Sequence, residues 1–265
     1  MKTSSDYADI MVFTMIDSLE LPAVLNELEV RCNCKRPKAF KATYNYTYRN
    51  KSGVDLIIKV RSIGQAGNQA AAMETIDALH RFGPRFAFLC GIAGAMHQKD
   101  DLKLGDIVVS KQIDSIRFDK VTDVDNKPLF HRAAFSIPVT SNIQDFIQEF
   151  QLNYTFPNRN DSDFSRSVNL NQRMPKFHHS VIFSWDLVLS SATFCADLVS
   201  NNRHRLAVEM EAAGFFSAID HYAAQCKRYN IDVKVDGLTI RGLSDHAVDK
   251  DKSDAFRTVD WRSVA

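Results

Sequence analysis

Two short segments in the last third of the chain place acidic side chains at the end of an apolar run. The first is Val208-Glu209-Met210-Glu211-Ala212-Ala213, and the second is Ile240-Arg241-Gly242-Leu243-Ser244-Asp245. Ligands of open α/β sheets bind in the crevice at the carboxyl ends of the strands, so two such ends can face one site. Together the segments predict a site that holds a hydroxyl-rich substrate and protonates a leaving group.

The carboxylates of the first segment suit a sugar diol. Glu209 and Glu211 stand two residues apart, so on a strand they would share one face. A carboxylate accepts two hydrogen bonds side by side, which matches the 2′- and 3′-hydroxyls of ribose. The alternative is that these acids only complement the dipole of the helix that follows.

Two further carboxylates could move protons. Asp245 follows a buried strand, where partial desolvation favours a neutral carboxyl group that can act as an acid, with Ser244 to orient it. Ser244-Asp245-His246 cannot be a hydrolase triad, because triad members come from separate segments. Glu20 lies just past the first predicted strand and could deprotonate a water. The alternatives are a turn cap at Ser244 and Asp245 and a first-turn helix acid at Glu20.

The elements that must position these residues alternate between strands and helices. Apolar or alternating runs predict strands, and apolar residues at helical spacing predict helices. We expect strands at 10–15, 39–48, 54–61, 86–92, 107–110, 206–210 and 233–243, an apolar run at 181–189, a polar loop at 158–171, and helices at 19–30, 68–82, 143–150 and 211–226. This alternation predicts one α/β domain over residues 1–265, with a central mixed twisted sheet flanked by helices.

The composition excludes several classes of protein. The 265 residues are 45% hydrophobic, enough for one large domain. A formal net charge of +1 gives no field that favours nucleic acid or a membrane surface. No apolar stretch reaches the roughly 20 residues that a spanning helix needs. The polar start at residues 1–6 lacks a signal-peptide core, and five scattered cysteines fit reduced thiols, so we expect a cytoplasmic protein.

We expect no metal and no cofactor. Cys32-Asn33-Cys34 is too tight for the gap of two residues that is usual in zinc sites. His178 and His179 would point to opposite faces of a strand. Gly64-Gln65-Ala66-Gly67 lacks the spacing of a dinucleotide fingerprint and the Lys-Ser/Thr of a phosphate-binding loop, so it predicts a tight turn.

In chain order, several segments resemble the nucleoside phosphorylase/nucleosidase superfamily, most nearly the methylthioadenosine/S-adenosylhomocysteine nucleosidases and their relatives. The matching segments are 19–24, 64–72, 90–95 (Cys-Gly-Ile-Ala-Gly-Ala), 104–110, 190–194, 208–213 and 241–245. They span nearly the whole chain. Val-Glu-Met-Glu-Ala followed by Arg-x-x-Ser-Asp is the most specific pair among them. The resemblance implies a nucleoside phosphorylase-like fold and cleavage of an N-glycosidic bond.

The resemblance also implies a role for each residue. Asp245 would protonate N7 of a purine, with adenine the expected base, Glu20 would activate the attacking water, and Glu211 would hold the ribose diol. The other expected substrate contacts are Phe194, on which the base would stack, Met210, Glu209, Ser244 and Arg241, and the Ile92-Ala93-Gly94 turn. Bond cleavage builds positive charge on the sugar and negative charge on the purine, and this set would stabilise both.

The chain departs from the family's phosphorylases where these bind phosphate. Ile16-Asp17-Ser18 replaces a glycine-rich turn, and Leu89 and Ile92 take the positions of an Arg/Ser pair. A phosphate dianion against apolar side chains would be poorly compensated, which favours water as the nucleophile. Ser191-Ala192 also replaces a frequent Gly-Asp, so the loop beside the base can differ.

Several questions stay open. A phosphate-dependent purine nucleoside phosphorylase is one alternative, and a non-catalytic nucleotide-sensing module of a larger protein is the other. The chain ends soon after Trp261, where the family continues into a C-terminal helix, so it could be one domain of a longer protein. The 5′ substituent could be hydroxyl, methylthio, homocysteine or phosphates. Lys250, Lys252 and Arg257 could meet a 5′-phosphate or form a solvated loop.

The resemblance also implies an assembly. Family members complete the sugar pocket with a segment of a neighbouring subunit, which here would be a loop at residues 111–121. Ile113, Ile116 and Phe118 supply apolar side chains among its charges, and exposed apolar patches mark contact surfaces. We therefore expect a homodimer or an assembly of dimers. The alternative is a loop folded back on its own core.

Overall fold

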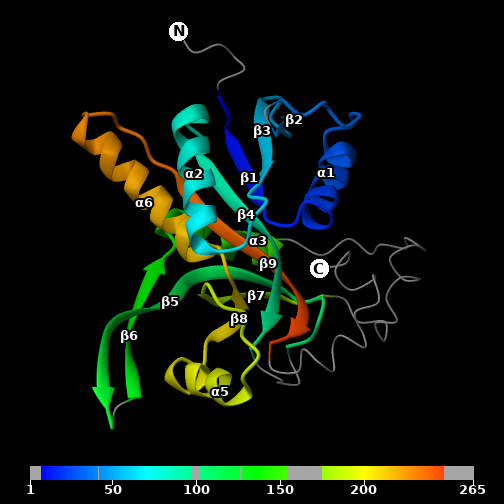
Figure 1. The fold of residues 1–265 in the computed structure, drawn as a ribbon. Helices are drawn as coiled ribbons and strands as arrows, with labels where there is room; N and C mark the ends of the chain where they lie inside the picture. The colour runs from blue at the N-terminus through cyan, green and yellow to red at the C-terminus, as the bar shows by residue number, and fades with distance from the viewer. Residues whose placement is uncertain (1–6, 41, 97–101, 126, 154–174, 248–265) are drawn as a thin grey trace.

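A computed structural model of the chain describes residues 7–40, 42–96, 102–125, 127–153 and 175–247. Its strands form one mixed sheet with helices packed against it (Figure 1). The strands are β1 Ile10–Thr14, β2 Thr43–Arg49, β3 Asp55–Ser62, β4 Phe86–Ala95, β5 Ile107–Val124, β6 Lys127–Pro138, β7 Phe177–Ser184, β8 Arg205–Glu209 and β9 Asp236–His246, and the helices are α1 Glu20–Arg31, α2 Asn68–Phe82, α3 Ser141–Asn153, α5 Ala192–Asn201 and α6 Ala212–Arg228.

The sheet is open on one side and closed on the other. The strand order is β2-β3-β1-β4-β8-β7-β5-β6, and β9 pairs in parallel with β4 and antiparallel with β5. Strands β4, β8, β7, β5 and β9 therefore form a closed ring of pairs. This closure places the end of β4 between β8 and β9, where the predicted site residues lie.

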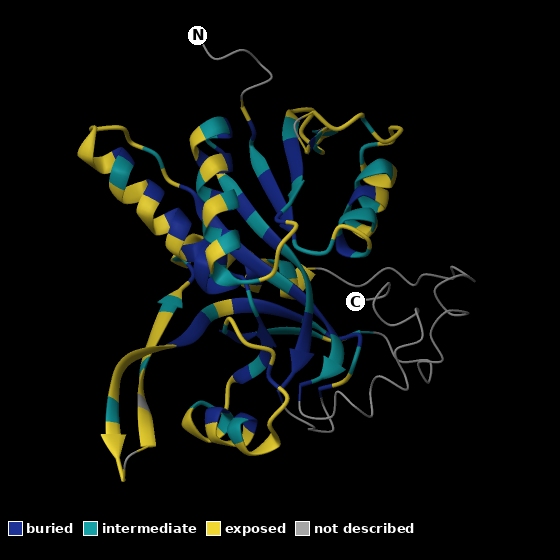
Figure 2. Cartoon of the chain, viewed as in Figure 1, coloured by how far each residue is buried: buried dark blue, intermediate teal, exposed yellow. Residues whose placement is uncertain are grey.

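Helices cover the two faces of the open part of the sheet. Helices α2 and α6 lie side by side over one face, and α1 lies beside β2 and β3 on the other (Figure 1). Side chains of β1 alternate between the two faces, as a strand requires. Phe13 packs against Phe215 of α6, with ring centroids 5.9 Å apart, while Val12 belongs to the cluster around Leu25 of α1. The buried residues concentrate along the strands between these layers (Figure 2).

The predicted fold class is confirmed. The expected helices at 19–30, 68–82 and 211–226 are α1, α2 and α6, and the expected helix at 143–150 lies within α3. The expected strands at 39–48 and 54–61 correspond to β2 and β3, an antiparallel pair whose connecting turn includes Gly53 with a φ of 80°.

Two predicted strand ends are wrong. Strand β4 continues to Ala95, so Ile92-Ala93-Gly94 is extended strand and not a turn. Strand β9 continues to His246, so Ser244 and Asp245 lie within it and not past its end. The reason is mutual pairing, because β4 and β9 hydrogen-bond in parallel to their last residues across a register shift after Ala93.

The predicted loop at 111–121 is also wrong. These residues continue β5, which pairs from Gln112 to Val124 with the unpredicted strand β6 and projects from the body as a hairpin (Figure 1). The register of β5 against β7 shifts between Ser110 and Gln112, and its register against β6 shifts between Phe118 and Lys120. Such bulges break the two-residue alternation by which a strand is recognised in a sequence.

The remaining predictions concern two polar segments, membrane-spanning helices and the cysteines. The polar loop at 158–171 and the basic residues Lys250, Lys252 and Arg257 lie outside the described residues. Among the helices that the structure describes, none combines the length and the apolar character needed to cross a membrane. All five cysteines are free thiols.

Candidate active site

A buried arginine joins the two acidic segments. The side chain of Arg241 on β9 is fully buried. Its Nη2 donates hydrogen bonds to Oε2 of Glu209 and, at 3.1 Å, to Oε2 of Glu211. Burial lowers the pKa of Arg241, but the two carboxylates outweigh this effect and raise it above its ordinary value. The guanidinium therefore stays charged, and removing Arg241 would leave buried carboxylates without a cation to compensate them.

The spacing of Glu209 and Glu211 predicted that the two side chains share one strand face. This prediction is wrong. Strand β8 ends at Glu209, and α6 begins after Glu211. Glu209 instead turns back onto the helix start, where its Oε2 accepts hydrogen bonds from the backbone N–H of Glu211 at 3.1 Å and of Ala212 at 3.0 Å. The first amides of a helix lack partners within the helix, and Glu209 supplies an acceptor for them.

The next amides of α6 are bound by residues that the sequence did not single out. Ala213 N donates to Ser184 Oγ at 3.0 Å, and Gly214 N donates to Asn68 Oδ1 at 2.8 Å. Ser184 Oγ also donates to Asn68 Oδ1 at 3.0 Å. A Cβ at Gly214 would overlap the backbone of Asn68, so only glycine lets the starts of α2 and α6 meet here. This contact fixes the position of the Glu211 carboxylate.

Glu211 lies at this junction with only 3% of its surface exposed. The backbone N–H of Gly67 lies 3.4 Å from its Oε1. Gly64 and Gly67 have φ values of 73° and 114°, which favour glycine, and the place of this predicted turn beside Glu211 is new. Burial raises the pKa of Glu211 to about 7, although Arg241 opposes the effect. The carboxylate therefore changes charge near neutral pH.

Glu20, the first residue of α1, is buried and held by three backbone amides. Its Oε2 accepts hydrogen bonds from Met15 N at 2.6 Å and Ile16 N at 2.9 Å, and its Oε1 accepts one from Ile92 N at 2.9 Å. A carboxylate has about four acceptor positions, so one remains for a further donor. Because these amides precede the helix or lie on β4, Glu20 is not merely a helix-dipole acid.

Gly91 lets Glu20 and Arg241 approach the same point of β4. A Cβ at Gly91 would lie 2.7 Å from Glu20 Cδ and would overlap Arg241 Nη1. Gly91 was not among the predicted site residues, although a glycine within a strand is a signal of close approach. Glu20, Arg241, Glu209 and Glu211 thus form one buried cluster.

Asp245 lies farther along the same pair of strands. Its Oδ2 accepts a hydrogen bond from Ser244 Oγ at 2.9 Å, whereas its buried Oδ1 has no hydrogen-bond partner among the described residues. A Cβ at Gly94 would lie 3.1 Å from this Oδ1, so the free oxygen faces β4 at Gly94. Gly91 and Gly94 are three residues apart, about 10 Å on a strand. That stretch separates the Glu20 cluster from Asp245.

Phe194 lies in a separate aromatic cluster that adjoins this site. Its ring centroid is 5.1 Å from that of Trp185, and Arg132 Cζ lies 4.5 Å from the Phe194 centroid. Ser191 Oγ accepts a hydrogen bond from Phe194 N at 3.3 Å at the start of α5. Trp185 N in turn donates to the carbonyl of Glu209 at 3.0 Å, which links the aromatic cluster to the acidic one. Trp185 was not predicted.

The remaining predicted residues lie between these groups. Met210 is partly buried between Glu209 and Glu211, outside both β8 and α6. The carbonyl of Ala93 lies 3.5 Å from Ser244 Oγ. Ile92 is partly buried and lines a pocket together with Glu20. Within the described ranges, no group of His, Cys, Asp and Glu side chains has the arrangement of a metal site.

The comparison with protein families decides the family. A model of the phosphorylase superfamily matches residues 10–263. This chain belongs to the phosphorylase superfamily. The matched range includes β1, Glu20, both acidic segments and β9.

Solved structures share the fold of this superfamily member at low sequence identity. A 5′-methylthioadenosine/S-adenosylhomocysteine nucleosidase of Colwellia psychrerythraea in complex with adenine is 18% identical, with a TM-score of 0.55 over 98% of this chain and 90% of that one. A Helicobacter pylori nucleosidase variant with 5′-methylthioadenosine in its active site is 19% identical, with a TM-score of 0.59 over 97% and 94%. Futalosine hydrolase of H. pylori is 17% identical, with a TM-score of 0.56 over 98% and 95%.

One curated relative aligns with the superfamily member in part. It is an uncharacterized protein of Sinorhizobium fredii, 25% identical over 154 residues. The alignment spans 56% of this chain and 35% of that protein. The relative is therefore much longer than the shared region.

Proposed function

We propose that the protein hydrolyses the N-glycosidic bond of a purine nucleoside or nucleotide, with adenine as the base. The observation that carries this proposal is that two groups of acidic residues lie against different points of β4. The cluster of Glu20, Arg241 and Glu211 lies at Gly91, and the free oxygen of Asp245 lies at Gly94. Cleavage of this bond needs anionic groups at the sugar and an acid at the base, a short distance apart.

Asp245 acts as the general acid. Its Oδ1 is buried and without a partner among the described residues, while Ser244 holds Oδ2 at 2.9 Å. A buried polar atom without a partner costs free energy unless a ligand satisfies it. Purine N7 is an acceptor that a protonated Asp245 can meet, and its protonation neutralises the charge that develops on the leaving base.

Glu20 acts on the attacking water. Three amides fix its carboxylate and leave about one acceptor position, which a water can occupy. A base must lie within hydrogen-bond reach of the proton that it removes, and a fixed carboxylate meets this condition without reorganisation. The proton of the water passes to Glu20 as the oxygen bonds to the anomeric carbon.

Glu211 holds the ribose diol, and Glu209 positions it. Glu211 has acceptor capacity beyond its contacts with Arg241 and Gly67. Glu209, in contrast, uses its oxygens on Arg241 and on the first amides of α6. We therefore propose a positioning role for Glu209 in place of the substrate contact expected from the sequence.

Water is favoured over phosphate by the surroundings of Glu20. The pocket that contains this carboxylate has no cationic residue among the residues that line it. A phosphate dianion there would meet aliphatic side chains and a carboxylate, and the nearby Arg241 is already paired with Glu209 and Glu211. The three carboxylates at catalytic positions also favour an enzyme over a non-catalytic nucleotide sensor, because a sensor needs no acid at Asp245.

The protein assembles as a homodimer or an assembly of dimers through the β5–β6 hairpin. The exposed large hydrophobic side chains described on the hairpin include Phe118, Val121, Val124, Leu129 and Phe135. Exposed apolar patches of this kind mark contact surfaces. The five free thiols support a reducing compartment, and we place the protein in the cytoplasm.

The test is a substrate panel. The protein is incubated with adenosine, methylthioadenosine, S-adenosylhomocysteine, AMP and ATP, and free adenine is measured by chromatography. Asp245→Asn serves as the inactive control. We expect adenine release from at least one compound by the wild type and a loss of about 10²-fold or more in the variant. Equal release by both proteins would remove the site from the reaction.

A further inference from the structure

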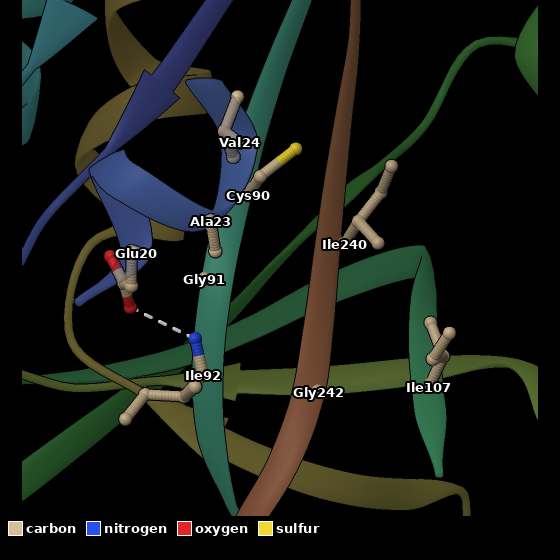
Figure 3. A pocket seen from close by; sticks show the side chains of 9 residues that line it. All are labelled: Glu20, Ala23, Val24, Cys90, Gly91, Ile92, Ile107, Ile240 and Gly242. Atoms are coloured by element: carbon tan, nitrogen blue, oxygen red, sulfur yellow. Dashed lines mark hydrogen bonds between the residues drawn. The ribbon is translucent and has the colours of Figure 1, made fainter. Parts of the chain in front are cut away.

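A pocket of about 120 Å³ opens beside Glu20, between α1 and the sheet. It is lined by Glu20, Ala23, Val24, Cys90, Gly91, Ile92, Ile107, Ile240 and Gly242 (Figure 3). In this view the Glu20 carboxylate lies at one end, hydrogen-bonded to Ile92 N, and the side chains of Cys90, Ile240 and Ile107 lie toward the other. The proposed function places only a water here.

The spacing of these residues explains why they share one surface. Glu20, Ala23 and Val24 stand at i, i+3 and i+4 of α1, which is one face of a helix. Cys90 and Ile92 stand two residues apart along β4, so their side chains point to one face of the strand. On the neighbouring strand, Ile240 pairs with Cys90 and Gly242 with Ile92, and Ile107 pairs with Gly242.

Glu20 is the only carboxylate among the residues that line the pocket, and no lysine, arginine or histidine lines it. Apart from Glu20 the lining is aliphatic side chains, glycine backbone and one thiol. Burial raises the pKa of the Cys90 thiol to about 12, so it stays neutral and behaves as an apolar group. The pocket therefore offers a single hydrogen-bonding anchor and an apolar wall beside it.

The stereochemistry of the sugar decides which group of the reactants can occupy this pocket. In a β-nucleoside the 2′- and 3′-hydroxyls and an incoming nucleophile lie on the ring face opposite the base, whereas the 5′ carbon lies on the same face as the base. Glu211 binds the diol and Glu20 the nucleophile, so a pocket that contains Glu20 lies on the nucleophile's side. Its occupant is therefore a group attached to the nucleophile and not the 5′ substituent.

We propose that this pocket admits the alkyl chain of a small primary alcohol, which replaces water as the nucleophile at Glu20. The inference rests on the proposed hydrolase function and extends it to glycosyl transfer. The bond between the anomeric carbon and the purine breaks, and a bond between that carbon and the alcohol oxygen forms. The hydroxyl proton passes to Glu20, and the base takes a proton from Asp245. The products are free base and an alkyl riboside.

The size of the pocket sets the preferred alcohol. A cavity of 120 Å³ is somewhat smaller than the roughly 150 Å³ that accepts benzene, so it suits a chain of about three carbons. Burial of one methylene contributes about 0.8 kcal/mol, which corresponds to about fourfold in preference over water. The ratio of alkyl riboside to free sugar, per mole of alcohol, should therefore rise from methanol through ethanol to 1-propanol.

The experiment measures this ratio by mass spectrometry with methylthioadenosine as substrate, or with whichever panel compound releases base. Ethylene glycol is the polar comparison, because it replaces the end of the propyl chain by a second hydroxyl. We expect 1-propanol to exceed ethylene glycol by about tenfold. Free sugar as the sole product at every alcohol concentration, with base release continuing, would overturn the proposal.

Variants that fill the pocket give the structural test. Val24→Phe places a ring within the pocket, and Ala23→Phe places one at its exposed mouth. Val30→Phe makes the same change as Val24→Phe on the same helix, at a side chain that is 74% exposed and outside the pocket. We expect the first two to lower the 1-propanol ratio toward that of ethylene glycol, and Val30→Phe to leave it unchanged.

The ratio of alkyl riboside to free sugar compares two products of the same reaction. A variant with lower turnover therefore still gives a result. An unchanged ratio in both pocket variants would contradict the proposal and leave the hydrolase function intact. Absence of base release from every compound and under every condition would instead refute the hydrolase function, and the alcohol transfer with it.

Discussion

Ser244 donates a hydrogen bond to one carboxylate oxygen of Asp245 at 2.9 Å and leaves the other oxygen buried without a partner in the described part of the chain. The bound oxygen is fixed, and the free one faces Gly94 on the neighbouring strand. This asymmetry is what an acid needs when it must meet one acceptor of a substrate in one orientation.

Asp245→Asn should keep the shape of the side chain and remove the acid. We expect kcat to fall by about 10²-fold or more, with little change in the melting temperature, because Ser244 can still donate to an amide oxygen. Steady-state kinetics and thermal unfolding check this prediction. The matched surface control is Asp232→Asn, which should behave as the wild type. Near-wild-type turnover of Asp245→Asn would exclude it as the acid.

Glu20→Gln should impair both the rate and the fold. Glutamine has one oxygen for the three amides that Glu20 now binds, so at least one buried N–H loses its acceptor. An unsatisfied buried donor costs about 1–3 kcal/mol, and a neutral amide cannot take a proton from water. Urea unfolding and kinetics check both effects. Glu27→Gln, a partly exposed position on the same helix, is the control.

A free energy of unfolding unchanged by Glu20→Gln would show that the amides find other partners. Unchanged kcat would mean that Glu20 does not activate the nucleophile, whatever its effect on stability. The two readouts are independent, because the stability loss comes from the amides and the rate loss from the missing base.

Glu211 should make stability depend on pH. Its pKa is raised from 4.5 to about 7 in the folded chain, so the folded state binds its proton more tightly than the unfolded state. The contribution is therefore fully present below about pH 4.5 and is lost as pH rises to about 7. One pH unit corresponds to about 1.4 kcal/mol, so the loss is at most about 3 kcal/mol. Urea unfolding across this range checks the slope.

Glu211→Gln should remove that part of the slope, whereas Glu149→Gln on the exposed side of α3 should keep it. Turnover should move in the opposite direction to stability in the wild type, rising through about pH 7 as Glu211 ionises and stabilises the cationic sugar. A slope that is the same in Glu211→Gln would assign it to other groups.

Phe118→Asp tests the proposed assembly. The side chain is 49% exposed on the hairpin, and its ring lies 6.4 Å from that of Trp185, which links the hairpin to the site. We expect light scattering to show a shift toward monomer, together with lower activity. Phe146→Asp, at a side chain 54% exposed on α3, is the control. A wild-type monomer at micromolar concentration, or a change in neither property, would remove the hairpin as the interface.

The residues of the site could be selected from the sequence, but their partners could not. Glu20 and Asp245 are found because each acid lies at or near the end of an apolar run. The contact between Glu20 and Ile92 N, however, joins residues 72 positions apart and depends on β1 and β4 being neighbours. Asn68 and Ser184 act through backbone amides of α6, a role that no residue type or spacing indicates.

The fold, too, could be predicted only in part from the sequence. The class and most helices follow from periodicity, which is a local property. The β5–β6 hairpin was missed because bulges interrupt its alternation, and the true ends of β4 and β9 depend on the pairing of two distant segments. Gly91 belongs to a segment that resembles the superfamily. Its function, however, depends on Arg241 and Glu20, which approach from other elements.

The most direct measurement is product analysis with and without phosphate. The protein is incubated with the best substrate of the adenine-release panel in a phosphate-free buffer, and the base and the sugar product are quantified by chromatography and mass spectrometry. The account predicts equal amounts of free base and free sugar, at a rate that added phosphate does not increase. Base release only in the presence of phosphate, with a sugar phosphate as the second product, would contradict it.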